Sequence, residues 1–452
     1  MQPLTAASDD SLVRMQRLSG LAREVLDQCA RLGASQAEVT MNEDAGLSVN
    51  VRMGEVETVE RTRDRGVGLT VYFGQRKGSA STADLQPDSL RATVEQACAI
   101  ARHTEADPAS GLADANRMAT DLREFDGWHP WPLDADRAIA LALEAEAAGR
   151  GADARISNSD GAGAYSSESI SVYANSHGFL GAERGTSHSL SVSLIAGSGD
   201  KMQRDYWYTS ALSPDDLEAP AQVGRRAAER TLRRLNPRPI RTGEYPVLFA
   251  PEMARSLVGH LLGAVSGGAL YRRASFLLDH AGKQILPDWF GIAERPHLVR
   301  GLRSSAFDAE GVATVDSDLV RDGILQRYVL GSYSARKLGL QSTGNAGGVN
   351  NLAVTANATG LIDMARAMGR GLLVTELMGQ GANTVTGDYS RGAAGFWVDG
   401  GELVHPVDEL TIAGRLPDMY RAIEAVGADV DPRSHVSVGS ILVGRMMVAG
   451  EA

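Results

Sequence analysis

The sequence predicts an α+β protein, with an N-terminal α/β domain followed by a C-terminal strand-rich domain. A chain of 452 residues is too long for one compact core, so more than one domain is expected. Helical and strand-like apolar patterns alternate in the first half of the chain, and strand-like patterns prevail after it. Fifty glycines punctuate the apolar segments, as turns and bulges do in β-rich proteins.

The first unit reads as a helix, several strands and a second helix. Residues 8–32 carry apolar side chains at a spacing of three to four, and Gly33 supplies a stop, which predicts a helix. Residues 37–73 contain four stretches of period two, AEVTM, LSVNVRM, VETVERTRD and GVGLTVYF, which predict strands. Pro87 then opens a helix that is expected to run to His103.

The same order recurs further along the chain. A helix is predicted over 134–150, strands follow in SISVYANS, SHSLSVSLIA and MQRDYWYTSA, and another helix is expected from Pro214 to Leu235. We interpret this as a duplicated helix–strands–helix unit. The alternative is an ordinary alternation of helices and strands without duplication.

The segment 236–246 contains three prolines and marks the domain boundary. We therefore expect an N-terminal domain over 1–236 and a C-terminal domain over 243–452. The second domain should form a curved, barrel-like sheet with a few helices. Its clearest local element is GFWVDGGELVHPV (395–407), a predicted hairpin with Asp-Gly-Gly at its tip.

Composition argues against several classes of function. The net charge of −11 disfavours nucleic acid as a partner, because binding phosphates requires clustered Lys and Arg. The N-terminus has no apolar signal-peptide core and no run of about 18 apolar residues occurs, so a cytoplasmic protein without a membrane span is expected. The two cysteines, Cys29 and Cys98, form no CxxC pair and are expected to be buried free thiols.

One stretch suggests a metal site without completing it. SLVGHLLGAVSGG (256–268) has the apolar spacing of a helix and carries a single histidine, His260. A metal site on a helix needs a second ligand on the same face and a third from elsewhere. His260 has neither a histidine nor a carboxylate within the next two turns, which favours a structural role.

Two glycine-rich stretches, 342–351 and 376–396, combine small residues with Asp, Asn, Ser and Thr. Such stretches either connect hairpins or receive an extended peptide or a partner loop. The residues expected to contact a peptide or a partner are Asn345, Gly347, Gly348, Thr386, Asp388, Tyr389, Ser390 and Arg391.

Three longer runs carry a family resemblance. GGALYRRASFLLDHAGKQILPDWF (267–290), GSYSARKLGLQSTGNAGG (331–348) and the stretch 371–414 strongly resemble the PmbA (TldE) branch of the TldD/PmbA family. The match covers the C-terminal half with specific motifs, and the N-terminal half agrees in organisation. The resemblance implies a cytoplasmic TldD–TldE pair acting as a zinc metalloprotease on unfolded or small peptides.

The resemblance also gives a meaning to the incomplete metal helix. The TldD branch carries H-E-x-x-x-H there, with a distal Cys as the third zinc ligand. On this chain the two histidines correspond to Gly259 and Ala264, the glutamate to His260, and the Cys to a position near Val438. No catalytic residue, metal or cofactor is therefore expected in this chain. Zinc is expected in a TldD-like partner, and this chain would form a heterodimer with it, or a homodimer when alone.

Two other functions remain open at this point. The chain could be a stand-alone hydrolase with a site built from Asp388, Tyr389 and Arg391, although no motif marks a nucleophile or base. It could also be a regulatory binding protein, as an older description of the family as modulators of DNA gyrase suggests. The acidic charge disfavours direct DNA contact in that case but not contact with a protein.

Overall fold

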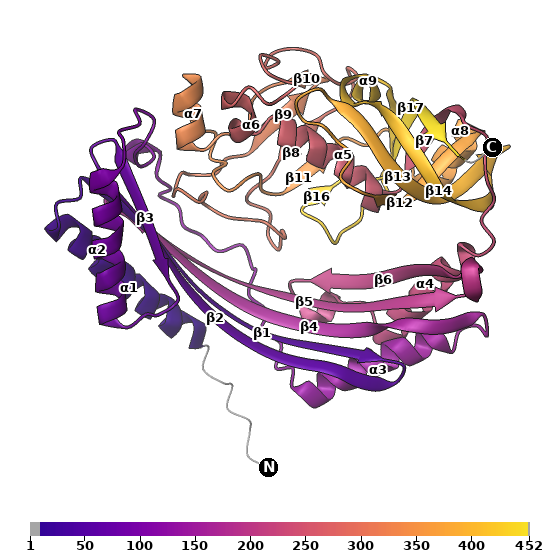
Figure 1. Cartoon of the computed structure of the whole chain (residues 1–452), viewed down its shortest axis with the longest axis horizontal. Coiled ribbons are helices and arrows are strands. Elements are labelled where there is room, and N and C mark those ends of the chain that lie inside the picture. Colours follow the sequence, from indigo (N-terminus) through magenta and orange to yellow (C-terminus); the bar gives the residue numbers. More distant parts are fainter. Residues whose placement is uncertain (1–9, 451–452) are drawn as a thin grey trace.

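A computed structural model describes residues 10–450 of the chain. Its N-terminal half is one antiparallel sheet in the order β3-β2-β1-β4-β5-β6. The strands are β1 (Gln36–Arg52), β2 (Glu55–Phe73), β3 (Arg76–Thr82), β4 (Ile156–Asn175), β5 (Leu180–Ala196) and β6 (Gln203–Ala211). The sheet is long and curved, and its concave side faces the C-terminal half (Figure 1).

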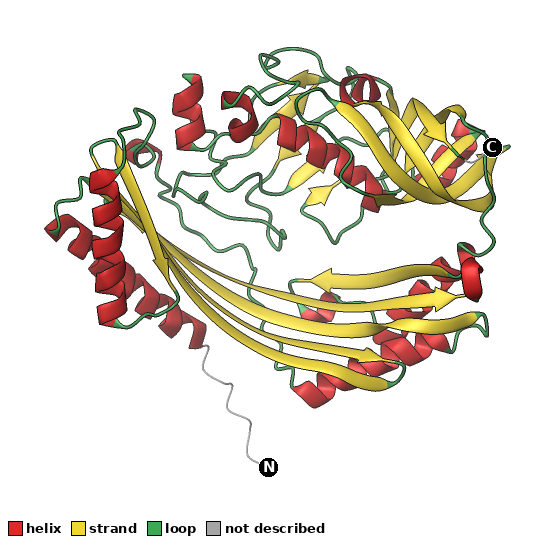
Figure 2. Cartoon of the chain, in the orientation of Figure 1, coloured by secondary structure: helices red, strands yellow, loops and turns green. Residues whose placement is uncertain are grey.

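The expected repeat of helix, strands and helix is present. The first unit is α1 (Asp10–Arg31), β1 to β3 and α2 (Pro87–His103), and the second is α3 (Ala135–Arg150), β4 to β6 and α4 (Pro220–Arg233). The units join where β1 pairs antiparallel with β4, from Glu38 opposite Asn175 to Val51 opposite Ala162. Each pair of helices packs on its own part of the sheet, forming two separate apolar clusters, and all four lie on the convex side (Figure 2).

Several boundaries differ from the expectations. The four short stretches expected between 37 and 73 are two long strands, β1 and β2, because polar and glycine residues between them continue the ladder. The fourth helix begins at Pro220 rather than Pro214. Residues Pro214–Asp216 form only a 3₁₀ turn, in which Ser213 accepts a hydrogen bond from the backbone N–H of Asp215 at 3.3 Å.

The C-terminal half contains a closed barrel, as the barrel-like expectation anticipated. Its five strands are β7 (Gly243–Phe249), β12 (Gly371–Met378), β13 (Asp388–Asp399), β14 (Glu402–Arg415) and β17 (Ile441–Ala449). Pairing of β14 with β17 closes the ring, and β15 (Ile423–Val426) adds to β17 at its side. The predicted hairpin is β13–β14, with Gly400 and Gly401 at positive φ in its turn.

A second, smaller sheet lies beside the barrel. It contains β8 (Ile292–Glu294), β9 (Ser317–Arg321), β10 (Ile324–Leu325), β11 (Leu352–Val354) and β16 (Val436–Ser437). The helices of this half are α5 (Pro251–Ala264), α6 (Gly267–Tyr271), α7 (Ser332–Leu338), α8 (Leu361–Met368) and α9 (Leu416–Arg421). The largest apolar core of the described residues joins α5, the barrel strands and the smaller sheet.

The two halves are joined by polar contacts at both ends of the long sheet. At the α7 end, the Arg336 guanidinium donates to the carbonyls of Ala109 and Gly111, at 3.3 and 3.0 Å. At the α4 end, Arg230 pairs with Glu252 at 3.2 Å. None of the helices in the described part of the chain is long and apolar enough to cross a membrane.

Candidate functional site

Helix α5 carries Gly259, His260 and Ala264, three of the four positions that the family resemblance aligns with a metal motif. Pro251 opens it, where a missing N–H costs no hydrogen bond. Leu257 and Leu261 bury one side against the core, which leaves Gly259 exposed on the other. A Cβ at Gly259 would meet nothing within 4 Å, so this side of the helix is open.

The other two ligand positions lie inside the protein. Ala264 is 0% exposed and Val438, just after β16, is 1% exposed. Both belong to the main apolar core. Gly259, Ala264 and Val438 therefore offer no side-chain donor, and two of them are packed as ordinary core residues.

His260 is the one side chain among these positions that could hold a metal. Its ring lies edge-on to Tyr389, with centroids 5.8 Å apart. Its Nε2 atom is buried and has no hydrogen-bond partner among residues 10–450. Burial lowers the pKa of His260 below its usual value, and the nearby Arg391 charge lowers it further, so the imidazole is held neutral.

The residues present do not fit a zinc ion. A zinc site needs three or four N, S or O ligands in tetrahedral arrangement, and His260 supplies one. Across the described residues, no group of three His, Cys, Asp or Glu side chains is placed to hold a metal. The two cysteines are buried and free, as expected, and burial raises the pKa of Cys29 to about 12.

Strand β13 brings two of the expected contact residues to His260. Tyr389 and Arg391 are two residues apart and so share a face of the strand, and both interact with His260. Tyr389 is 1% exposed, and burial raises the pKa of its phenol to about 12. The Arg391 side chain lies close enough to the Tyr389 hydroxyl to oppose this rise in pKa by its charge and by a polar contact. That contact does not reach normal hydrogen-bond geometry, since neither the hydroxyl nor Nε of Arg391 has a geometric hydrogen-bond partner among the described residues.

Asp388 and Ser390 project to the opposite face of β13 and are exposed. The Thr386 hydroxyl donates to the Asp388 carboxylate at 2.6 Å. Asp388 and Ser390 line a surface pocket of about 490 Å³ together with Tyr389 and residues 380–384. The trio suggested for a stand-alone hydrolase is therefore divided between two faces of one strand.

The second glycine-rich stretch lies elsewhere. The Asn345 side chain is buried and donates to the Glu294 carboxylate at 3.0 and 3.1 Å. Gly347 and Gly348 have positive φ and line a different pocket, also about 490 Å³, between the two halves of the chain. The structure thus does not bring the two glycine-rich stretches into one pocket.

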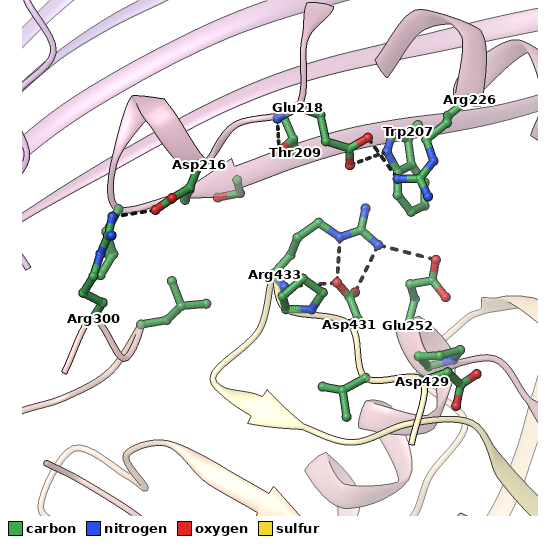
Figure 3. A pocket seen from close by; sticks show the side chains of 17 residues that line it. Trp207, Thr209, Asp216, Glu218, Arg226, Glu252, Arg300, Asp429, Asp431 and Arg433 are labelled. Atoms are coloured by element: carbon green, nitrogen blue, oxygen red, sulfur yellow. Dashed lines mark hydrogen bonds and ion pairs between the residues drawn. The ribbon is translucent and has the colours of Figure 1, made fainter. Parts of the chain in front are cut away.

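A third pocket, which the sequence did not indicate, lies where β6 and α4 meet the loop before β16 (Figure 3). Its centre is Arg433, whose guanidinium carbon is 3.9 Å from the Trp207 ring centre and 4.3 Å from that of Tyr208. Nε of Arg433 donates to Asp431 at 2.7 Å, and Nη2 reaches Glu252 at 3.5 Å.

The other charges of this pocket are also paired. Arg300 meets Asp216 at 2.6 Å, and Arg226 meets Glu218 at 2.9 Å. We therefore interpret this pocket as a polar contact that joins the two halves of the chain. Its only sequence signal was an aromatic cluster in YWYTS (206–210); nothing near Arg433 points to a partner more than 200 residues away.

The chain thus combines a sheet of two helix–strands–helix units with a closed barrel, and helix α5 lies beside the barrel. Three family models match the chain: PmbA/TldA metallopeptidase domain 1 over 37–101, its central domain over 128–235 and its C-terminal domain over 242–450. The chain belongs to the PmbA/TldD family, in its PmbA/TldE branch. The model of domain 1 falls within the first repeated unit, and the model of the central domain spans the second.

Individual relatives agree with this assignment. The chain is 50% identical to Metalloprotease PmbA of Escherichia coli O157:H7 over 92% of each chain, and 48% identical to a Metalloprotease PmbA homolog of Haemophilus influenzae over 96% of each. Among solved structures, a putative modulator of DNA gyrase from Bacteroides thetaiotaomicron has a TM-score of 0.91 at 27% identity, covering 96% of this chain and 99% of that one. TldE from Thermococcus kodakarensis shares the fold, with a TM-score of 0.82 at 20% identity over 95% and 100%.

Proposed function

We propose that this chain is the subunit of a two-chain cytoplasmic peptidase that carries no zinc, and that a TldD-like partner supplies the metal. The observation that carries the proposal is the state of helix α5. It is a regular helix, but Gly259 and Ala264 on it, and Val438 after β16, have no side-chain donor atoms. Metal-dependent hydrolysis needs a bound water made acidic by the ion and a base to take its proton, and this chain offers neither.

The role left to this chain is to complete the partner's site and to bind the peptide. A subunit built like its partner can dock with approximate two-fold symmetry. Small or unfolded peptides are the substrates that fit the family, and Thr386, Asp388, Ser390, Gly347 and Gly348 are candidate contacts at its surface.

The test is to express this chain alone, the TldD-like chain alone, and the two together. We expect hydrolysis of an unfolded peptide by the pair, with the two chains co-eluting in size-exclusion chromatography. A pair whose TldD-like chain lacks its metal-binding histidines should still assemble but be inactive. Hydrolysis by this chain alone at the rate of the pair would overturn the proposal.

A further inference from the structure

Three polar groups at helix α5 lack hydrogen-bond partners in the same place. Only seven buried side-chain atoms within residues 10–450 have none, and His260 Nε2, the Tyr389 hydroxyl and Arg391 Nε are three of them. An unsatisfied buried polar group costs about 1–3 kcal/mol, so natural proteins rarely leave several together. Such a cluster indicates that something absent from the chain itself completes it.

The missing partner must be an acceptor with negative charge. Arg391 Nε and the Tyr389 hydroxyl carry hydrogens to donate, and neutral His260 can donate from Nε2 in one tautomer. Within the described part of the chain, the Arg391 guanidinium forms no ion pair with a carboxylate, in contrast to Arg433. The nearest carboxylate along the strand, Asp388, lies on the other face of β13.

A carboxylate meets these requirements better than water. It brings two oxygens and a full negative charge, and its hydrogen bonds to a guanidinium are about twice as strong as neutral ones. A water molecule could bridge the groups but would leave the Arg391 charge unmatched. A metal ion is excluded as the ligand of this cluster because it would lie against a permanent positive charge with one nitrogen ligand.

The cluster lies close to the surface. Gly259, next to His260, is exposed, and so is Gly263 one turn later. A Cβ on either would meet nothing within 4 Å. On the β13 side, the Arg391 stem lies beside Gly381, at 3.4 Å from where its Cβ would be, and Gly381 lines the surface pocket that ends at Tyr389.

We propose that His260, Tyr389 and Arg391 form a carboxylate-binding site beside the emptied metal helix, and that its ligand is the terminal or side-chain carboxylate of a peptide. The guanidinium supplies the positive charge that holds the carboxylate. This inference rests on the proposed function only for the choice of a peptide as the source of the carboxylate. Binding of the carboxylate requires this chain alone.

The test uses the full chain without a partner, in isothermal titration calorimetry. Three probes separate the sources: acetyl-Ala-Ala with a free carboxyl terminus, the same peptide as its C-terminal amide, and acetyl-Ala-Asp-Ala-amide. We expect at least one acid probe to bind about tenfold or more tightly than the amide, as the loss of one charge-assisted hydrogen bond implies. The acid probe that binds better identifies a terminal or a side-chain carboxylate.

Variants connect binding to the three residues. R391Q should weaken the acid probe at least tenfold and Y389F several-fold, and both should leave the amide unchanged. R445Q is the matched control, because Arg445 is an exposed β17 arginine paired with Glu244, and it should bind like the wild type. Equal binding of acids and amide, no binding of either acid, or R391Q binding like the wild type would overturn the proposal. Failure of the paired peptidase assay with acid binding intact would count against the proposed function only.

Discussion

Two polar clusters touch helix α5 and differ in how their charges are matched. At its first turn, Glu252 takes part in the cluster around Arg433, where the arginine has two carboxylate partners and two aromatic faces. Roughly two turns later, His260 meets Tyr389 and Arg391, where Nε of the arginine has no hydrogen-bond partner among the described residues. Helix α5 thus takes part in two networks. We call the Arg433 cluster closed because its charges are paired within the chain, and the His260 cluster open because it contains polar groups without a partner.

The difference separates a structural role from a binding role. The Arg433 cluster ties the N-terminal sheet to the C-terminal half, since its residues come from β6, α5 and the loop before β16. Its charges are paired within the chain, so the Arg433 cluster requires no external ligand. The His260 cluster draws its residues from α5 and β13, which both belong to the C-terminal half, so it does not tie the two halves of the chain together.

The largest expected loss of stability comes from breaking the closed cluster around Arg433. R433A removes the guanidinium that pairs with Asp431 at 2.7 Å and leaves this carboxylate, which is 7% exposed, only the longer ion pair with Arg255 at 3.6 Å. Breaking a buried ion pair costs about 3–5 kcal/mol. We expect a clear fall in the urea midpoint of the first unfolding transition. R445A removes an exposed ion pair and should leave the midpoint unchanged. A fall with R445A as large as that with R433A would refute the distinction.

A matched pair of tyrosines compares satisfied and unsatisfied hydroxyls directly. Tyr420 is buried and its hydroxyl donates to the carbonyl of Leu257 on α5 at 2.9 Å, so Y420F should cost about 1 kcal/mol. Y389F removes a hydroxyl without a partner and should cost nothing or stabilise slightly. Thermal unfolding of both variants decides; equal losses would mean that the Tyr389 hydroxyl is bonded after all.

The open face of α5 predicts a small gain in stability. G259A adds a methyl group with no neighbour within 4 Å, and replacing Gly by Ala inside a helix stabilises by about 0.5–1 kcal/mol. G224A on α4 is the opposite case, because its Cβ would lie 2.0 Å from the carbonyl of Ala145. Unfolding midpoints should rise for the first variant and fall for the second. A fall for G259A would show that the face is closed.

The neutral state of His260 predicts a pH dependence of stability. Its pKa in the folded chain lies below the usual 6.5, so on acidification the unfolded chain binds the proton first. Stability is therefore lost as the pH falls through about 6.5. His188 and His435 shift in the same direction, so H260Q should reduce this slope without abolishing it. Midpoints measured at pH 5.5 and 7.5 test this, and an unchanged slope would contradict it.

Much of the fold could be predicted because local patterns determine it. The helix over Pro87–His103 matched its predicted bounds, and the Asp-Gly-Gly turn identified its hairpin. The long strands were divided because residues 42–46 and Arg65 interrupt the apolar alternation on which strand prediction depends, although the ladder continues through them. The prediction that the fourth helix begins at Pro214 was wrong, because a second proline, Pro220, provides the first residue of the helix.

Only part of the candidate site could be predicted from the sequence. The motif positions around His260 depend on short spacings within one helix, so the sequence indicates them. The approach of Tyr389 to His260 joins residues more than 120 positions apart, and that of Arg433 to Trp207 joins residues more than 200 apart. No local pattern encodes such contacts. The direction in which Tyr389 and Arg391 point also follows from strand register, which the sequence alone left undetermined.

The most direct test of the central claim, that α5 has lost its metal, is the zinc content of this chain produced without a partner. The chain would be expressed in zinc-supplemented medium, dialysed against a chelator and analysed by mass spectrometry for metal per chain. With one donor at the four motif positions, we predict no stoichiometric zinc. One zinc per chain that survives dialysis and disappears in H260Q would contradict the account.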